Sequence, residues 1–297
     1  MSIQRSDFRF IHRMRVRWSE VDMQKIVFNA HYLTFFDTAM GEYWRALALP
    51  YEAALRQLGG DLYVKKSTLE YHASAQFDDM MDIGLKCVRI GTSSIVFQGS
   101  IYRGDTLLVS GELVYVFADP ASQSSHPVPA ALREVFESYE AAEPMVGMDL
   151  GSWAELGAKV SALRSEVFVG EQGIAPDGVW DESDAVALHA VALNRLGQTV
   201  ASGRLVQHST AVGRIGRMAV NRVLRGSRLG REVLTTLVRA AQERGDREVL
   251  VHAQCSAEGF YTRMGFAARG VAFEEAGIKH IEMALPLRVG PKVGASR

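Results

Sequence analysis

A short basic loop between an apolar strand and a helix carries the residues best suited to chemistry in this sequence. The expected strand ends in Arg217-Met-Ala-Val220, a loop containing Gly226 follows, and a helix is expected to start near Arg228. Backbone N–H groups at a helix N-terminus point at a bound anion, and arginines add charged donors. The stretch therefore predicts a pyrophosphate site, although a basic helix start taken alone is also typical of a solvated surface.

A second stretch, Asp22-Met-Gln-Lys-Ile-Val-Phe-Asn-Ala-His-Tyr32, places a carboxylate a few residues before a long expected helix. Asp22 is suited to act as a nucleophile or as a general base for water. Backbone donors near Asn29 and His31, at the helix N-terminus, can stabilise a developing oxyanion. The alternative is that Asp22 only satisfies a turn or caps the helix.

The basic loop resembles the acetyl-CoA site of the GNAT N-acyltransferases. Arg225-Gly-Ser-Arg-Leu-Gly230 is similar to their Arg/Gln-x-x-Gly-x-Gly/Ala fingerprint, with Arg228 where the middle glycine is usual. Phe260-Tyr-Thr-Arg-Met-Gly-Phe266 resembles the family motif Phe-Tyr-x-x-x-Gly-Phe, which implies that Tyr261 protonates the leaving thiolate. The resemblance covers nearly all of residues 150–287 and implies acetyl-CoA as cosubstrate. The residues implied to bind it are Met218, Ala219, Val220, Arg225, Gly226, Ser227, Arg228, Leu229, Gly230 and Arg231.

Acyl transfer also needs a base or a water path for the acceptor amine, whose identity the sequence leaves open. Glu171, Asp184 and His189 are candidates, although a histidine in a strand is more often structural. Cys255 fits a small core hydrophobe better than a covalent acyl carrier.

The Asp22 stretch resembles the active site of hotdog-fold acyl-CoA thioesterases of the 4-hydroxybenzoyl-CoA thioesterase type, Asp-x-x-Gly-x-Val-x-x-x-x-Tyr. Lys25 replaces the glycine, and Asn29 and His31 are exchanged relative to many members. The resemblance covers about residues 10–139 and implies Asp22 as the catalytic carboxylate, with Asn29 and His31 at the bound acyl-CoA. It also implies a homodimer or homotetramer. Lys25 can pair with Asp22, meet a CoA phosphate or remain solvated.

Hydrophobic periodicity predicts two domains of different architecture. We expect an α+β hotdog domain over 1–140, a linker over 141–148 and a mixed α/β GNAT domain over 149–297. The expected elements of the first are a strand over 8–18, a long helix over 30–48, strands over 62–72, 81–90, 93–103 and 106–118, and a helix over 130–139. Those of the second are helices over 152–167, 228–244 and 256–263, and strands over 186–193, 198–208, 214–220, 247–253 and 279–287.

Composition bounds the partners and the compartment. The 297 residues are 47% hydrophobic and 23% charged with a formal net charge of −1, which argues against nucleic acid or a membrane surface as the main partner. Cys87 and Cys255 lie in different halves, and no apolar signal core or run of about 18 apolar residues is present. We expect a cytoplasmic protein without a metal.

Together, the two resemblances imply a bifunctional enzyme that hydrolyses acyl-CoA thioesters and transfers an acyl group from CoA to an amine. The alternative is that one domain is catalytic and the other serves in oligomerisation or CoA sensing.

Overall fold

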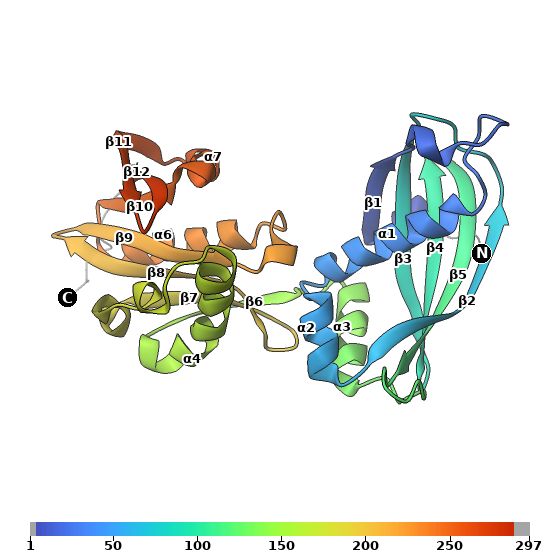
Figure 1. Cartoon of the computed structure of the whole chain (residues 1–297), viewed down its shortest axis with the longest axis horizontal. Helices are drawn as coiled ribbons and strands as arrows, with labels where there is room; N and C mark the ends of the chain where they lie inside the picture. Colours follow the sequence, from blue (N-terminus) through green and yellow to red (C-terminus); the bar gives the residue numbers. More distant parts are fainter. Residues whose placement is uncertain (1–3, 288–297) are drawn as a thin grey trace, which may run out of the picture. The chain divides into compact units, whose positions relative to one another are not determined.

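The computed structural model describes residues 4–287, which divide into two compact units after Met145 (Figure 1). The N-terminal unit is one antiparallel sheet of order β1-β3-β4-β5-β2 with a long helix, α1, against it. Its elements are β1 (Phe10–Arg15), α1 (His31–Ala46), α2 (Tyr51–Leu58), β2 (Asp61–Tyr71), β3 (Met80–Ile90), β4 (Ser94–Arg103), β5 (Thr106–Ala118) and α3 (Ala130–Glu140).

Helix α1 is buried on most sides, as its broad apolar stripe predicts. Its buried residues are Tyr32, Phe35, Phe36, Ala39, Met40, Tyr43 and Trp44. Two glycines that face each other across β4 and β5, Gly99 and Gly111, let the Phe36 ring approach the sheet. A Cβ added to Gly99 would lie 2.4 Å from Cε1 of Phe36. Small residues in the sheet therefore fix how closely the helix packs.

The C-terminal unit is a mixed sheet of order β11-β12-β10-β9-β8-β7-β6, in which only β9 and β10 are parallel. Helix α6 covers one face, and α4 with the π-helical turn η3 covers the other. The elements are β6 (Val146–Gly151), α4 (Trp153–Arg164), η3 (Ser165–Glu171), α5 (Pro176–Val179), η4 (Glu182–Val186), β7 (Leu188–Asn194), β8 (Thr199–Ser209), β9 (Val212–Val220), η5 (Arg222–Leu224), α6 (Leu229–Arg244), β10 (Glu248–Gln254), α7 (Glu258–Arg263), β11 (Ala267–Glu275) and β12 (Ile278–Pro286).

Two α-helices and two strands are absent from the sequence-based expectations: α2, α5, β6 and β11. Of the expected linker 141–148, residues 146–148 lie in β6, where Val146 and Met148 pack against the core of the C-terminal unit. This packing explains why the division between the units falls directly after Met145.

Candidate functional site

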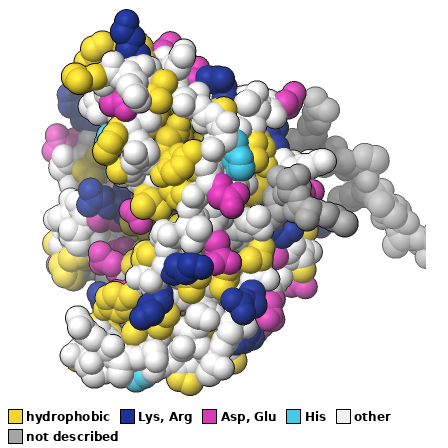
Figure 2. Space-filling view, turned by 90° about the vertical axis from the view of Figure 1, so that its right-hand side faces the viewer, with side chains coloured by type: hydrophobic (Ala, Val, Ile, Leu, Met, Phe, Trp, Pro, Cys, Tyr) yellow, Lys and Arg dark blue, Asp and Glu magenta, His cyan; other side chains and the backbone are white. Residues whose placement is uncertain are grey.

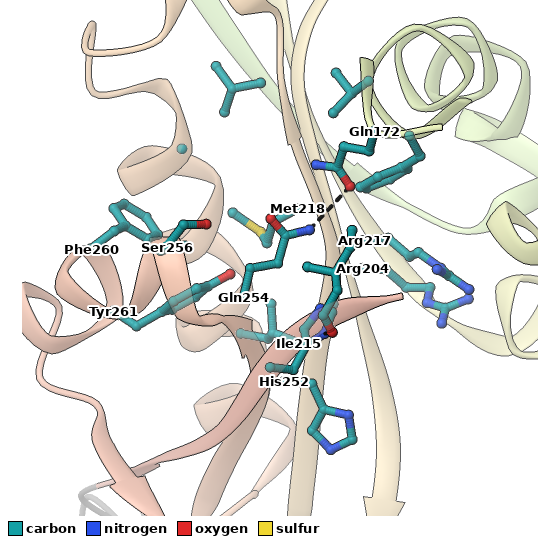
Figure 3. A pocket seen from close by; sticks show the side chains of 18 of the residues that line it. Gln172, Arg204, Ile215, Arg217, Met218, His252, Gln254, Ser256, Phe260 and Tyr261 are labelled. Atoms are coloured by element: carbon teal, nitrogen blue, oxygen red, sulfur yellow. Dashed lines mark hydrogen bonds between the residues drawn. The ribbon is translucent and has the colours of Figure 1, made fainter. Parts of the chain in front are cut away.

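A cavity of about 1040 Å³ lies in the C-terminal unit, between the ends of β9 and β10 (Figure 3). The two strands pair over only four positions, residues 212–215 with residues 248–251. Beyond these, residues 216–220 and 252–254 continue as strand without pairing to each other. The facing edges of the two strands are therefore available to an extended ligand that enters the cavity.

Basic residues gather where the N-terminus of α6 meets this cavity. The lining there consists of Arg225, Gly226, Arg228, Leu229, Gly230 and Arg231. Arg228 directly precedes α6 and has a φ of 71°, in the left-handed region that favours glycine. The arginine thus keeps the backbone conformation to which the usual motif glycine is suited, and it adds a positive charge.

Not every residue of the expected cofactor set reaches the cavity with its side chain. Met218 and Val220 line it, whereas Ala219 packs on the opposite face of the sheet, in the cluster that contains Leu163. Ser227 is tied into its own turn, because both its hydroxyl and its N–H donate to the Leu224 carbonyl. Ala219 and Ser227 are therefore the two members of the set that do not line the cavity.

Tyr261 lies in α7 at the wall of the cavity, between the rings of Phe260 and Phe266 at centroid distances of 5.0 and 5.7 Å. Figure 3 shows its hydroxyl directed into the cavity. Burial raises the pKa of Tyr261 to about 12. The phenol is therefore protonated at neutral pH and can donate a proton.

Asp184 and His189 lie in a buried ionic network and do not line the cavity. The Asp184 carboxylate accepts hydrogen bonds from Arg164 at 2.8 Å and from Arg204 at 2.9 Å. His189 accepts from Arg164 through Nδ1 and donates to the Asp184 carbonyl through Nε2, so both ring nitrogens are engaged. Burial lowers the pKa of His189, which keeps the ring neutral. This geometry fits a structural role for both residues.

The other two candidates also lie outside the cavity lining. Glu171 accepts a hydrogen bond from Arg225 at 2.7 Å, which ties η3 to the basic loop. Cys255 is exposed, in contrast to the core position expected for it.

Sequence reasoning missed two polar residues on the cavity wall formed by β10. Val249, Val251 and Ala253 pack with α6, so the alternate residues His252 and Gln254 face away from that helix. Gln254 donates to Gln172 of the α4 side at 3.2 Å, the bond drawn in Figure 3. The alternation of apolar and polar residues over 251–254 is the signal that could have identified them.

His252 pairs with acidic residues of two neighbouring strands. Its Nδ1 lies 3.0 Å from a carboxylate oxygen of Glu275 in β11, and its Nε2 lies 3.9 Å from Glu282 in β12. A carboxylate bonded to one ring nitrogen orients the ring and leaves the other nitrogen as the candidate proton acceptor. The pair can therefore accept a proton inside the cavity.

In the N-terminal unit, Asp22 lies in a hollow of about 580 Å³ that is also lined by Trp18, Val21, Lys25, Gln76 and Phe77. The Asp22 carboxylate accepts the Gln24 N–H at 2.8 Å, as in a turn. Lys25 is exposed and has a φ of 62°, again the region that favours the motif glycine. Both replacements of a motif glycine, Lys25 and Arg228, thus occur at left-handed residues.

Asn29 and His31 flank the start of α1, which begins at His31. The Asn29 carbonyl accepts the Tyr71 hydroxyl at 3.3 Å, and the His31 ring stacks on Phe35 at 6.4 Å. Tyr32 is buried, and its hydroxyl accepts the Ala75 N–H at 3.0 Å. These contacts hold the N-terminus of the helix against the segment that follows β2.

Among residues 4–287, no cluster of three or more His, Cys, Asp or Glu side chains could hold a metal ion. Within the same range, no helix has both the length and the apolar character needed to cross a membrane.

Comparison with known proteins assigns each unit to a family. Residues 24–110 match the thioesterase superfamily, and residues 165–287 match the acetyltransferase (GNAT) domain. Asp22 precedes the first matched segment by two residues.

The following relatives each match less than half of the chain. An acyl-CoA thioester hydrolase, YbgC of Escherichia coli, is 28% identical over 125 residues, which are 42% of this chain and 92% of YbgC. A UPF0039 protein of Schizosaccharomyces pombe is 32% identical over 127 residues, 42% of this chain and 84% of that protein. The crystal structure of a hypothetical protein from Aquifex aeolicus is 24% identical and covers 43% of this chain and 98% of its own, with a TM-score of 0.40.

Proposed function

We propose two acyl-CoA activities for this chain. Its N-terminal unit belongs to the thioesterase superfamily and its C-terminal unit to the GNAT acetyltransferases. The chain shares its family with the UPF0039 protein of Schizosaccharomyces pombe. The N-terminal unit hydrolyses acyl-CoA thioesters. The C-terminal unit transfers an acetyl or other acyl group from CoA to an amine.

The cavity between β9 and β10 is the observation that carries the transferase proposal. Its basic end, at Arg225, Arg228 and Arg231, suits the CoA pyrophosphate, because backbone N–H groups and guanidinium groups both favour an anion there. The unpaired strand edges beyond it suit the extended arm of the cofactor, with residues 218–220 alongside. The thioester then lies near Tyr261, whose protonated phenol donates to the leaving thiolate.

We also propose His252 as the base that takes the proton from the acceptor amine. It lines the same cavity as Tyr261, and its Nδ1 lies 3.0 Å from a carboxylate oxygen of Glu275. Attack of the neutral amine on the thioester carbonyl forms the C–N bond and breaks the C–S bond. The amine proton passes to His252, directly or through water, and the CoA sulfur receives the Tyr261 proton.

Hydrolysis is proposed to depend on Asp22. Its carboxylate lines an open hollow formed partly by the segment that precedes α1, where it can attack the thioester or activate water. Backbone donors near Asn29 would stabilise the oxyanion, whereas the His31 N–H already donates to the Phe28 carbonyl at 2.9 Å. The hydrogen bond from the Gln24 N–H is compatible with this role, since it orients the carboxylate and leaves its second oxygen available.

A second copy of the chain is proposed to complete the thioesterase site through β2. This strand is at the edge of its sheet, and residues 63–68 are exposed on both faces. Tyr63, Val64 and Tyr71 are among its exposed side chains, and Figure 2, which views this side of the chain, shows hydrophobic groups at its surface. A long unpaired edge is a template for strand pairing. Sedimentation at micromolar concentration should give a dimer or tetramer, and a monomer would contradict the pairing.

The direct test is a panel of acyl-CoA thioesters followed by release of free CoA thiol, with and without amines. The proposal predicts amine-independent release for some acyl chains and additional, amine-dependent release for acetyl-CoA. Thiol release that never increases when an amine is added would refute the proposed transferase activity. Thiol release that always requires an amine would refute the proposed hydrolase activity.

A further inference from the structure

We propose that the amine acceptor of the C-terminal unit carries an anionic group, a carboxylate or a phosphate, which Arg217 binds. This inference rests on the proposed transferase function of the same cavity and adds the chemical class of the acceptor. It starts from an irregularity in β9.

Arg217 is the extra residue of a β-bulge. The register between β8 and β9 shifts so that residues 217 and 218 stand opposite the single residue Gly203. Arg217 has a φ of 51°, which costs free energy for a residue other than glycine. The bulge turns Arg217 toward Asp181 while Met218 still packs with the α6 core. Bulges beside functional sites commonly re-aim a side chain in this way.

The cluster that Arg217 joins has surplus positive charge. Three guanidinium groups, of Arg164, Arg204 and Arg217, share the two carboxylates of Asp181 and Asp184. Burial would raise the pKa of Asp181, but hydrogen bonds from Arg204 and Arg217 outweigh it and hold that pKa below its usual value, so the carboxylate is ionised. Arg217 is the most exposed of the three arginines, at 23% against 0% for Arg164 and 5% for Arg204. It lines the cavity together with Arg204 and Asp181.

The guanidinium of Arg217 is also under-used. Within residues 4–287 it makes one hydrogen bond, from Nη2 to Asp181 at 3.0 Å, and its buried Nε has no partner. Arg214, further back on the same strand, lines the same cavity with a second guanidinium. The lining also includes the apolar residues Phe168, Ile174 and Val206.

The position of Arg217 separates it from the CoA phosphates. Arg225, Arg228 and Arg231 lie at the start of α6, whereas Asp181 and Arg204 belong to the face covered by α4 and η3. Figure 3 shows Arg204 and Arg217 side by side, across the strand from Tyr261. His252 also faces away from α6, and the charged groups near it are Glu275 and Glu282. An acceptor with its anionic group on Arg217 therefore enters on the side where the proposed base lies.

The test compares acceptors in matched pairs with acetyl-CoA as donor: amino acids against their methyl esters, and 2-aminoethyl phosphate against ethanolamine. The wild-type chain should prefer the anionic member of at least one pair by about tenfold or more in kcat/KM, since a charge-assisted contact is lost in the neutral one. Whether the carboxylate or the phosphate pair responds identifies the group.

Arg217→Gln should reduce this preference by about tenfold, mainly through the acceptor KM, and leave the Kd for acetyl-CoA unchanged. Arg217→Lys should restore part of the preference, and Arg214→Gln should weaken it if Arg217→Gln fails to fold. Arg239→Gln, an exposed position on α6, is the matched control and should change nothing.

Three outcomes overturn the proposal: equal use of neutral and anionic amines, a preference that survives Arg217→Gln, or a loss of acetyl-CoA affinity in that variant. The last would assign the arginine to the cofactor. Transfer to no amine at all would refute the proposed transferase function as well, so the two failures are distinguishable.

Discussion

Replacement of Arg228 by glycine should strengthen the fold and weaken the cofactor site at the same time. Arg228 has a φ of 71°. In the folded state, the left-handed conformation costs a residue with a Cβ about 1–2 kcal/mol. In the unfolded state, the greater freedom of glycine offsets about 0.4–1 kcal/mol of the stability gained by removing that cost. Arg228→Gly should therefore raise the free energy of unfolding of the C-terminal unit by roughly 0.5–1 kcal/mol. At about 2–4 °C per kcal/mol, its Tm should rise by a few degrees at most.

The same change removes a guanidinium from the proposed phosphate site. Loss of a charge-assisted contact costs about 1.5–3 kcal/mol, so the Kd for acetyl-CoA should rise by about tenfold or more. Calorimetric titration and thermal unfolding of one preparation measure both effects. Arg228→Ala should show the same loss of affinity without the gain in stability, because alanine keeps a Cβ at a positive φ.

Lys25→Gly is the matched control in the other unit, since Lys25 has a φ of 62° and lies outside the acetyltransferase cavity. It should raise stability and leave the Kd of that cavity unchanged. Equal stability of Arg228→Gly and Arg228→Ala would refute the conformational argument, and an unchanged Kd in both would refute the assignment of Arg228 to the phosphate.

Further predictions concern packing and acid stability. Gly99→Ala should destabilise the N-terminal unit by about 1–3 kcal/mol in urea, because the new Cβ would lie 2.4 Å from Phe36; an unchanged midpoint would contradict the packing described. Asp184→Asn should cost about 3–5 kcal/mol, since it removes a counter-ion of the fully buried Arg164, and a loss under 1 kcal/mol would contradict this account. Burial raises the pKa of Asp184 but the Arg164 contacts outweigh it, so the folded pKa lies below the unfolded value of about 3.9. The ionised Asp184 carboxylate therefore stabilises the fold above about pH 3.9, and this contribution is lost as the pH falls through the folded pKa. Asp184→Asn removes the contribution, so it should change the pH midpoint of acid unfolding measured by circular dichroism.

Much of the architecture is predictable from the sequence because its signals are local. The long helix α1, the meander β3 to β5 and the strand–loop–helix around Arg228 follow from periodicity and from motif residues a few positions apart. The elements that sequence reasoning missed have weak local signals. Helix α2 is only eight residues long and buries few side chains, and β11 is exposed along nearly its whole length.

The polar wall of the cavity depends on information that the sequence does not express locally. Arg217 meets Asp181 because of a bulge in strand pairing, and His252 meets Glu275 because β10, β12 and β11 are neighbours in the sheet. Asp184 and His189 are candidates for the base by residue type alone. In the fold both are hydrogen-bonded to Arg164, which is 20 or more residues away in the sequence. Long-range pairing, rather than residue type, decides which polar residues face the cavity.

The independence of the two sites is tested most directly by one paired measurement on Asp22→Asn and Tyr261→Phe. Both substitutions are nearly isosteric, and CoA thiol release is measured with and without an accepted amine. Asp22→Asn should abolish amine-independent release, with a fall of about 10²-fold or more, and spare transfer to the amine. Tyr261→Phe should lower transfer and spare hydrolysis, because it removes one hydroxyl and keeps the packed ring. If either variant lost both activities at unchanged stability, a single shared site would replace the two-site account.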